Sequence, residues 1–138
     1  MSLSILRNNE NAIATYLSTV VTGSALTASV TTGFNNIDKI APIVIVYSSN
    51  STEDFPYSGI YHVDTQIIVK EMASDINVNT TQLAYTIYNN LLSGSAIPAI
   101  NTYGGYYCYN ILVKDHREDI VEDAHIHTLS IDSMCALQ

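Results

Sequence analysis

The chain has 138 residues, 47% of them hydrophobic and 13% charged, and a formal net charge of −8. This length and apolar content predict one compact domain over residues 1–138 and exclude a disordered chain. The basic residues are scattered, and even the nearest pair, Lys114 and Arg117, forms no cluster, so direct nucleic-acid binding is not expected. No apolar run approaches the roughly 20 residues of a membrane span, and the N-terminus lacks a signal-peptide pattern, so we expect a cytoplasmic product without membrane contact.

The N-terminal segment is predicted to form an amphipathic helix over residues 3–21. Leu6, Ile13 and Leu17 recur at helical spacing, although the polar run 7–11 interrupts the apolar stripe. The asparagines of that run are poor helix formers. One helix with an apolar face is therefore expected.

Three strands are expected next. Residues 24–32 are rich in small and β-branched side chains, and residues 43–47 are continuously apolar, which is typical of a strand covered on both faces. Residues 49–59 have the Ser, Pro, Asp and Gly content of a loop. Residues 60–71 alternate, which predicts that one face carries Tyr61, Val63, Thr65, Ile67 and Val69 and the other Ile60, His62, Asp64, Gln66 and Lys70.

The period then changes to that of a helix over residues 80–92, where Asn79 and Gln82 resemble a capping box. A connection over 93–105 leads to a strand over 106–114. Its core side is predicted to carry Tyr107, Tyr109, Ile111 and Val113. The acidic run 115–123 is expected to turn outward, and a last strand to follow over 124–133.

This order of elements predicts an α+β fold: a mainly antiparallel β-sheet of four to five strands with two helices packed on it. No internal repeat is visible in the sequence. One domain with a single core is expected.

Two short histidine patterns raise the question of a metal site. His62 and Asp64 share one strand face, as do His125 and His127, and the four side chains would supply nitrogen and oxygen ligands if their strands were neighbours. The alternative interpretation is that they are solvated side chains on a scaffold, and we favour it. A small metal-binding protein or metal-dependent enzyme that uses these four residues is kept as the second hypothesis.

No catalytic, cofactor-binding or metal-binding residues are assigned. The sequence contains no GxSxG, GxxxxGK[ST] or GxGxxG motif, and its carboxylate pairs lie in polar loops. Cys108 and Cys135 have no CxxC spacing and are expected to be small apolar fillers of the core. We therefore expect a protein that is not an enzyme and needs no cofactor.

Tyrosine is the unusual residue, with 10 copies beside 2 phenylalanines and no tryptophan. Tyrosine suits protein interfaces because it joins apolar area to a hydrogen-bonding tip. The alternative is that it replaces other aromatic residues in the core, which we favour for Tyr85, Tyr88, Tyr107 and Tyr109. The candidate contact residues for another subunit or a partner are Phe55, Tyr57, Tyr103 and Tyr106.

The order of these segments resembles the tail terminator, or tail completion, proteins of tailed bacteriophages and related neck proteins. The resemblance spans most of residues 1–135. It is carried by the apolar run APIVIVYSS, the long strand GIYHVDTQIIVKEMASD, the helix TTQLAYTIYNNLL and the final strands YYCYNILVKD and DAHIHTLSIDSMCAL. The long charged hairpin of some members has no obvious counterpart, unless loop 49–59 is its shortened form.

The resemblance implies a structural virion protein that forms a homo-oligomeric ring, usually a hexamer. Such a ring caps the tail tube and joins it to the head–neck region, so the expected partners are further copies of the chain, the tail tube protein and a head–neck connector protein. The expected location is the virion tail or neck, after assembly in the host cytoplasm. A different phage neck or connector adaptor on the same fold is a third hypothesis.

Overall fold

The computed structural model of the chain describes residues 2–23, 29–33, 43–72, 78–121 and 124–137. Within these residues the elements follow one another as α1 (Ser2–Gly23), β1 (Ser29–Thr32), β2 (Ile43–Glu53), β3 (Tyr61–Met72), α2 (Val78–Leu92), α3 (Ala96–Ile100), β4 (Tyr106–Val121) and β5 (Ala124–Leu137). Part of the strand expected over 24–32, residues 24–28, lies outside the described residues.

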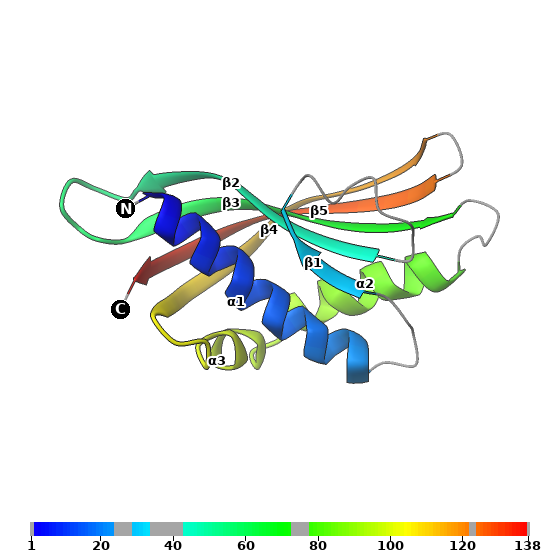
Figure 1. The fold of residues 1–138 in the computed structure, drawn as a ribbon, viewed down its shortest axis with the longest axis horizontal. Coiled ribbons are helices and arrows are strands. Elements are labelled where there is room, and N and C mark those ends of the chain that lie inside the picture. Colours follow the sequence, from blue (N-terminus) through cyan, green and yellow to red (C-terminus); the bar gives the residue numbers. More distant parts are fainter. Residues whose placement is uncertain (1, 24–28, 34–42, 73–77, 122–123, 138) are drawn as a thin grey trace.

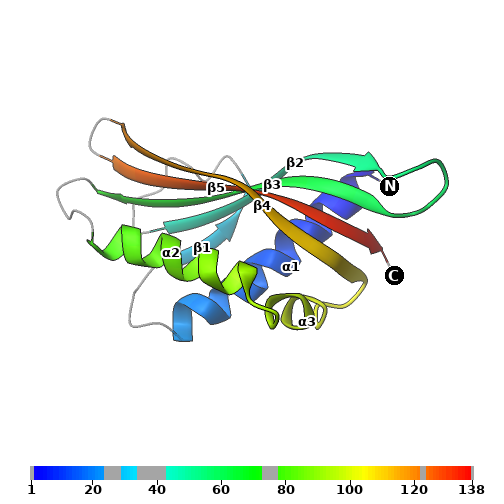
Figure 2. The same ribbon diagram turned by 180° about the vertical axis from the view of Figure 1, so that it is seen from behind.

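The strands form one sheet in the order β1-β2-β3-β5-β4. β1 runs parallel to β2, and the other neighbouring pairs are antiparallel. The helices lie on one face of this twisted sheet (Figures 1 and 2). The predicted α+β fold is therefore confirmed. The described residues contain five strands and one helix more than expected, because α3 forms inside the expected connection 93–105.

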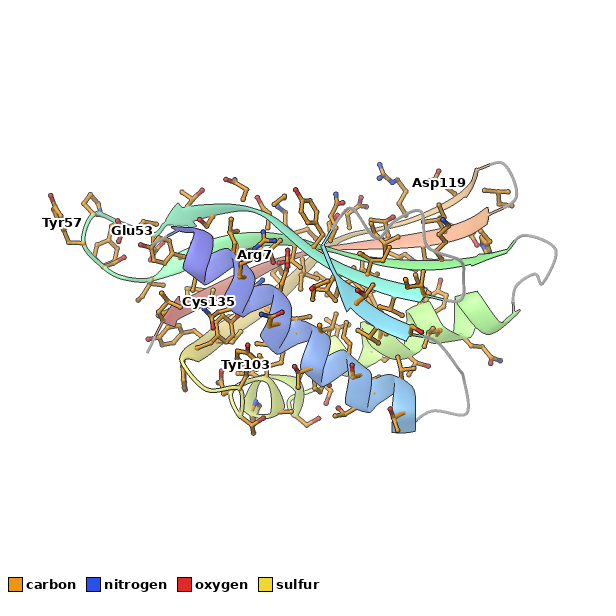
Figure 3. The ribbon with its side chains drawn as sticks, in the orientation of Figure 1. Arg7, Glu53, Tyr57, Tyr103, Asp119 and Cys135 are labelled. Atoms are coloured by element: carbon orange, nitrogen blue, oxygen red, sulfur yellow. The ribbon has the colours of Figure 1, made fainter. Side chains whose placement is uncertain are left out.

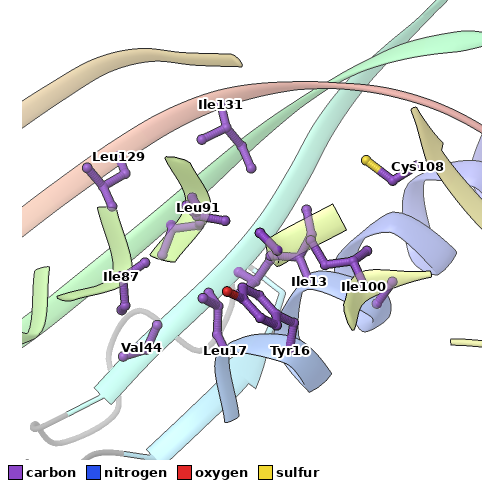
Figure 4. Close-up of a cluster of buried hydrophobic side chains, with 14 of the residues drawn as sticks. Ile13, Tyr16, Leu17, Val44, Ile87, Leu91, Ile100, Cys108, Leu129 and Ile131 are labelled. Carbon is purple, nitrogen blue, oxygen red and sulfur yellow. The ribbon is translucent and has the colours of Figure 1, made fainter. Parts of the chain in front are cut away.

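The main core lies between the helices and the sheet (Figure 4). Each fully buried aliphatic side chain contributes about 1.5–3 kcal/mol relative to an exposed one, so this interface is the main source of stability. Its members come from both layers: Ile5, Ile13 and Leu17 of α1, Leu83, Ile87 and Leu91 of α2, Ile100 of α3, and Val44, Val46, Val63, Ile67, Leu129 and Ile131 of the sheet.

The two predicted helices form, with small differences at their ends. α1 begins one residue before and ends two residues after the expected range 3–21. α2 begins at Val78, so Asn79 lies inside the helix rather than at its cap, and the side chains of residues 78–81 lie outside the described part. Pro98 is tolerated in α3 because it occupies the first turn, where a backbone N–H has no partner inside the helix.

The continuous apolar run of β2 is buried on both faces, as expected. Val44 and Val46 belong to the main core, whereas Ile43 and Ile45 form a second, smaller cluster with Ile68. β2 is buried in this way because it lies between β1 and β3. The alternation predicted for the following strand is also confirmed, since Val63, Thr65, Ile67 and Val69 are all buried on β3.

The predicted orientation of β4 is wrong at its start. Tyr106 and Cys108 are buried, whereas Tyr107 and Tyr109 are exposed. Further along, Ile111 and Val113 do pack against the core, as expected. A β-bulge explains the change, because the register moves from Cys108↔Cys135 directly to Asn110↔Met134 and the extra residue shifts the alternation by one.

Two expected loops are shorter than predicted. Residues 115–121 of the acidic run 115–123 do not leave the sheet, because β4 continues to Val121 and pairs with β5, and residues 122–123 lie outside the described part. Likewise, β2 continues through residues 49–53, so the loop expected over 49–59 begins only after Glu53. Polar side chains fit these strand segments because they lie on long hairpins beyond the centre of the core.

Two charged residues of α1, Arg7 and Glu10, bind the backbone of β2 beyond the end of β1. The last β1–β2 partners are Thr32 and Val46, and the backbone of Ser48 lies two residues further along β2. Glu10 Oε2 accepts a 2.8 Å hydrogen bond from Ser48 N, and Arg7 Nη2 donates one of 3.3 Å to Ser48 O. Arg7 and Glu10 also form a 3.3 Å ion pair, so they satisfy backbone groups that a longer β1 would have bonded.

Candidate interaction surfaces

The β2–β3 hairpin projects beyond the start of α1 and carries Tyr57 at its tip (Figures 1 and 3). The tip is held by backbone hydrogen bonds, from Asp54 N to Ile60 O at 2.8 Å and from Ser58 N to Phe55 O at 3.0 Å. Phe55 and Tyr57 are both exposed, and Tyr57 is 99% exposed. A loop fixed by its own hydrogen bonds therefore presents two aromatic side chains to solvent.

Tyr57 also has a strained backbone, with φ at +65°. This left-handed conformation costs a residue with a Cβ roughly 1–2 kcal/mol. Its side chain has no core contact to offset that cost, because it is almost fully exposed. Strain at an exposed aromatic residue is typical of a site maintained for contact with another molecule.

A second surface lies on β4, the outer strand of the described sheet. Leu112 and Ile120 are exposed large apolar residues of this strand, on opposite faces of the sheet, because Leu112 pairs with Asp132 and Ile120 with His125. Tyr107 and Tyr109 stack edge to face with 4.9 Å between ring centroids. Outer strands with exposed apolar side chains readily pair or pack with another chain. Sequence reasoning missed this surface because the bulge at Tyr109 reverses which tyrosines face the core.

The other two candidate contact residues lie deeper than expected. Tyr103 is partly buried against the main core. Tyr106 is fully buried, and its hydroxyl donates a 2.5 Å hydrogen bond to Asn9 Oδ1, so its expected position on the surface is wrong. Burial also raises the pKa of the Tyr106 phenol well above its usual range, which keeps it a hydrogen-bond donor.

The structure separates the two histidine patterns. β3 and β5 are neighbours, but His62 pairs in register with Met134 and His125 with Glu71, at opposite ends of the ladder. The core side of β5 carries His125 and His127, both buried, whereas His62 lies on the other face of the sheet, beside Asp132. The four-residue metal site of the second hypothesis is therefore wrong.

His62 and Asp64 instead form separate polar contacts on the face away from the helices. His62 Nδ1 lies 3.1 Å from Asp132 Oδ2, and its Nε2 lies 3.3 Å from Asp54 Oδ1. Asp64 pairs with Lys114 at 3.1 Å. The hydrogen bond to Asp132, with a smaller contribution from Asp54, raises the pKa of His62 above its ordinary value.

The two cysteines occupy the positions expected of apolar fillers. Cys108 and Cys135 are cross-strand partners, and both are buried free thiols. Burial raises the pKa of Cys108 to about 11 and that of Cys135 to about 12. Since the thiolate is the nucleophile, these residues are chemically inert at neutral pH.

A hollow of about 420 Å³ lies between α1, α2 and the start of α3. Its lining includes Tyr16, Thr19, Thr86 and Asn90, and Tyr16 donates a 3.2 Å hydrogen bond to the Asn90 carbonyl. The lining residues supply hydroxyl, amide and aliphatic groups. Such a lining offers a surface for contact rather than groups for acid–base chemistry.

No protein-family model and no curated protein matches this chain. Among solved structures, a chain in the virion of a native gene transfer agent particle is similar, with a TM-score of 0.49, 12% identity, and coverage of 91% of this chain and 96% of that chain. A crystal structure from Akkermansia muciniphila is similar with a TM-score of 0.36 and 10% identity, covering 100% of this chain and 79% of that chain. These low similarities leave the function to be argued from the chain's own residues.

Among the described helices, none has both the length and the apolar content needed to cross a lipid bilayer.

Proposed function

We propose that this chain is a structural virion protein of a tailed bacteriophage, a ring-forming tail terminator or tail completion protein. The order of sequence segments that resembles this family supports the proposal. The observation that carries it is the ordered hairpin tip with exposed Phe55 and strained, exposed Tyr57. Such a tip is built for contact with another protein, and the protein would act in the virion tail or neck after assembly in the host cytoplasm.

A ring of identical subunits needs two different patches on each subunit, because each head-to-tail contact joins one patch to the other. The outer strand β4 supplies exposed apolar side chains on both faces of the sheet: Leu112 on the face that carries Asp132, and Ile120 on the face that carries His125. Its 16-residue length provides a long edge against which a neighbouring subunit can pack. We assign this edge to the contact between subunits of a homohexamer.

The β2–β3 tip is assigned to the tail tube protein. It projects from the body of the molecule (Figure 1) and its loop is short and ordered. Exposed aromatic residues are preferred anchors in protein interfaces because they bury much area with few rotatable bonds. The head–neck connector would then bind elsewhere on the ring. In this role the protein acts by contact alone and needs no cofactor and no catalytic residue.

Mass photometry and size-exclusion chromatography of the purified protein test the ring. We expect a hexamer-sized particle, either in solution or after addition of purified tail tubes. Leu112→Asp should abolish that particle, whereas Leu92→Asp should not. The two leucines are a matched pair, since both are 57% exposed and Leu92 lies at the end of α2. A wild-type chain that stays monomeric and leaves tail tubes unbound would overturn the proposal.

A neck or connector adaptor on the same fold would use similar surfaces, since fold alone does not define a partner. Pull-downs with tail tubes and with head connectors, run side by side, distinguish the two roles. Retention by tail tubes supports the terminator. Retention by connectors alone would favour the adaptor.

A further inference from the structure

The hairpin of β4 and β5 brings three potential metal ligands together on the side that faces the helices. Glu118 is the cross-strand partner of His127, and His125 lies on the same face two residues earlier in β5. One ligand atom from each of the three side chains lies within 4.8 Å of the others. Glu118 lies seven residues before His125, in a run whose sequence predicts a loop, so the group becomes visible only in the register of β4 with β5.

Both distances from a histidine nitrogen to the Glu118 carboxylate are short. His127 Nε2 lies 3.3 Å from Glu118 Oε2, and His125 Nε2 lies 2.6 Å from the same oxygen. Two ligands of a tetrahedral zinc ion are separated by about 3.3 Å, given bonds of about 2.0–2.1 Å. The distance from His127 to Glu118 already matches this value. The distance from His125 to Glu118 must increase by a fraction of an ångström, and the Glu118 side chain, which is 56% exposed, can move toward solvent.

The imidazoles of His125 and His127 are buried, whereas the Glu118 carboxylate is exposed to solvent. The His125 and His127 side chains are 8% and 3% exposed. His125 Nδ1 is buried and has no hydrogen-bond partner in the described structure. An ion can therefore enter from the Glu118 side and meet ligands whose orientations are already fixed.

His116 orients the imidazole of His127. His116 Nε2 lies 2.8 Å from His127 Nδ1, and the His116 ring packs edge to face on Tyr85 of α2 at 5.4 Å. With a metal on His127 Nε2, the proton of this imidazole would be on Nδ1, and the Nδ1–H would donate a hydrogen bond to His116 Nε2. Such second partners are typical of metal-binding histidines because they fix the tautomer and the ring orientation.

The three side chains also supply the right kinds of ligand. Imidazole nitrogens and a carboxylate oxygen are the groups that bind zinc in proteins beside cysteine thiolates.

We propose that Glu118, His125 and His127 bind one divalent transition-metal ion of the zinc class, with His116 as the positioning residue for His127. Two imidazoles and one carboxylate are borderline ligands that suit Zn²⁺ and its neighbours in the first transition series better than Mg²⁺ or Ca²⁺. The remaining coordination position faces solvent and takes water. The inference does not depend on the tail-terminator role.

The test uses tag-free full-length protein, first treated with a chelator and then dialysed against Zn²⁺. We expect one Zn²⁺ per chain by elemental analysis, and a visible absorption band when Co²⁺ replaces Zn²⁺. Glu118→Gln should weaken Zn²⁺ binding at least about 10-fold while the protein stays folded, because the Glu118 side chain is largely exposed. His116→Phe should weaken it roughly 10–100-fold through the orientation of His127.

His62→Gln is the matched control, since this histidine lies beside two carboxylates on the opposite face of the sheet and should leave Zn²⁺ binding unchanged. Wild-type protein that retains no Zn²⁺ would overturn the proposal. So would equal Zn²⁺ binding by wild type and Glu118→Gln. Circular dichroism of each variant confirms that a loss of binding is not a loss of fold.

Discussion

The hydroxyl of Tyr106 on β4 donates a 2.5 Å hydrogen bond to the side-chain carbonyl of Asn9 on α1, across 97 residues of sequence. The Asn9 amide nitrogen in turn donates to Ser48 Oγ at 2.9 Å and Thr65 Oγ1 at 2.7 Å. All four residues are buried. One asparagine in the first helix therefore connects three strands of the sheet through a satisfied polar network.

Tyr106→Phe removes the hydroxyl and leaves the Asn9 carbonyl buried without this donor. We expect the free energy of unfolding to fall by about 1–3 kcal/mol, as for other buried groups deprived of a partner. Urea unfolding followed by circular dichroism measures the change. Tyr107→Phe is the control, because Tyr107 is exposed and its change should stay within about 0.5 kcal/mol. Equal stability of the two variants would contradict the network's role.

Glu10→Ala removes the acceptor for the backbone N–H of Ser48 beyond the end of β1. We expect it to destabilise the protein by about 1–3 kcal/mol, and Arg7→Ala to cost less because Arg7 is half exposed. Urea unfolding of both single variants and of the double variant gives their coupling energy, expected at about 0.5 kcal/mol or more. Strictly additive effects would show that the two side chains do not act together at Ser48.

Tyr57→Gly relieves the left-handed backbone at the hairpin tip. We expect stability to stay the same or rise by up to about 1 kcal/mol, because glycine adopts this conformation without strain. Binding to tail tubes should nevertheless weaken, since the aromatic anchor is lost. Thermal unfolding and a tube co-sedimentation assay measure the two effects on one sample. Phe55→Ala should weaken binding in the same way, and full binding by both variants would exclude the tip as a contact site.

His62→Gln tests the ion pairs on the face away from the helices. Because Asp132 and Asp54 raise the pKa of His62 in the folded protein, its stabilising effect is complete below the unfolded pKa of about 6.5. The effect disappears as the pH rises through the higher folded pKa. The variant should therefore be less stable than wild type at acidic pH and equal to it at alkaline pH. The difference should stay below about 1 kcal/mol because the pairs are partly exposed.

Unfolding midpoints of wild type and His62→Gln across this pH range measure that effect. A difference that grows toward alkaline pH would have the wrong sign and would contradict the assignment.

Periodicity in the sequence predicted the elements whose packing is simple. The alternation from Val63 to Val69 and the apolar run at the start of β2 each have one arrangement that buries their apolar side chains. The same holds for the apolar stripes of the two long helices. Phe55 and Tyr57 were likewise predictable as exposed, because they lie among loop-forming residues.

The orientation of β4 was decided by the tertiary structure alone. A bulge adds one residue and reverses the side-chain alternation, and no local pattern marks Tyr109 as that residue. The buried Tyr106 and the exposed Tyr107 follow from it. The bulge lets the strand place apolar residues in the core on both sides of Tyr109, namely Tyr106 and Cys108 before it and Ile111 and Val113 after it.

By itself, the sequence determined the layers of this protein, because burial of apolar side chains at periods of two and 3.6 residues needs only local information. The tertiary structure decided which polar groups meet. Asn9 reaches Tyr106, and Glu118 reaches His125 and His127, only after strand order and register are established. Hydrogen bonds and coordination depend on distances of a few ångströms between side chains of different elements, and the packed core and the strand register define those distances.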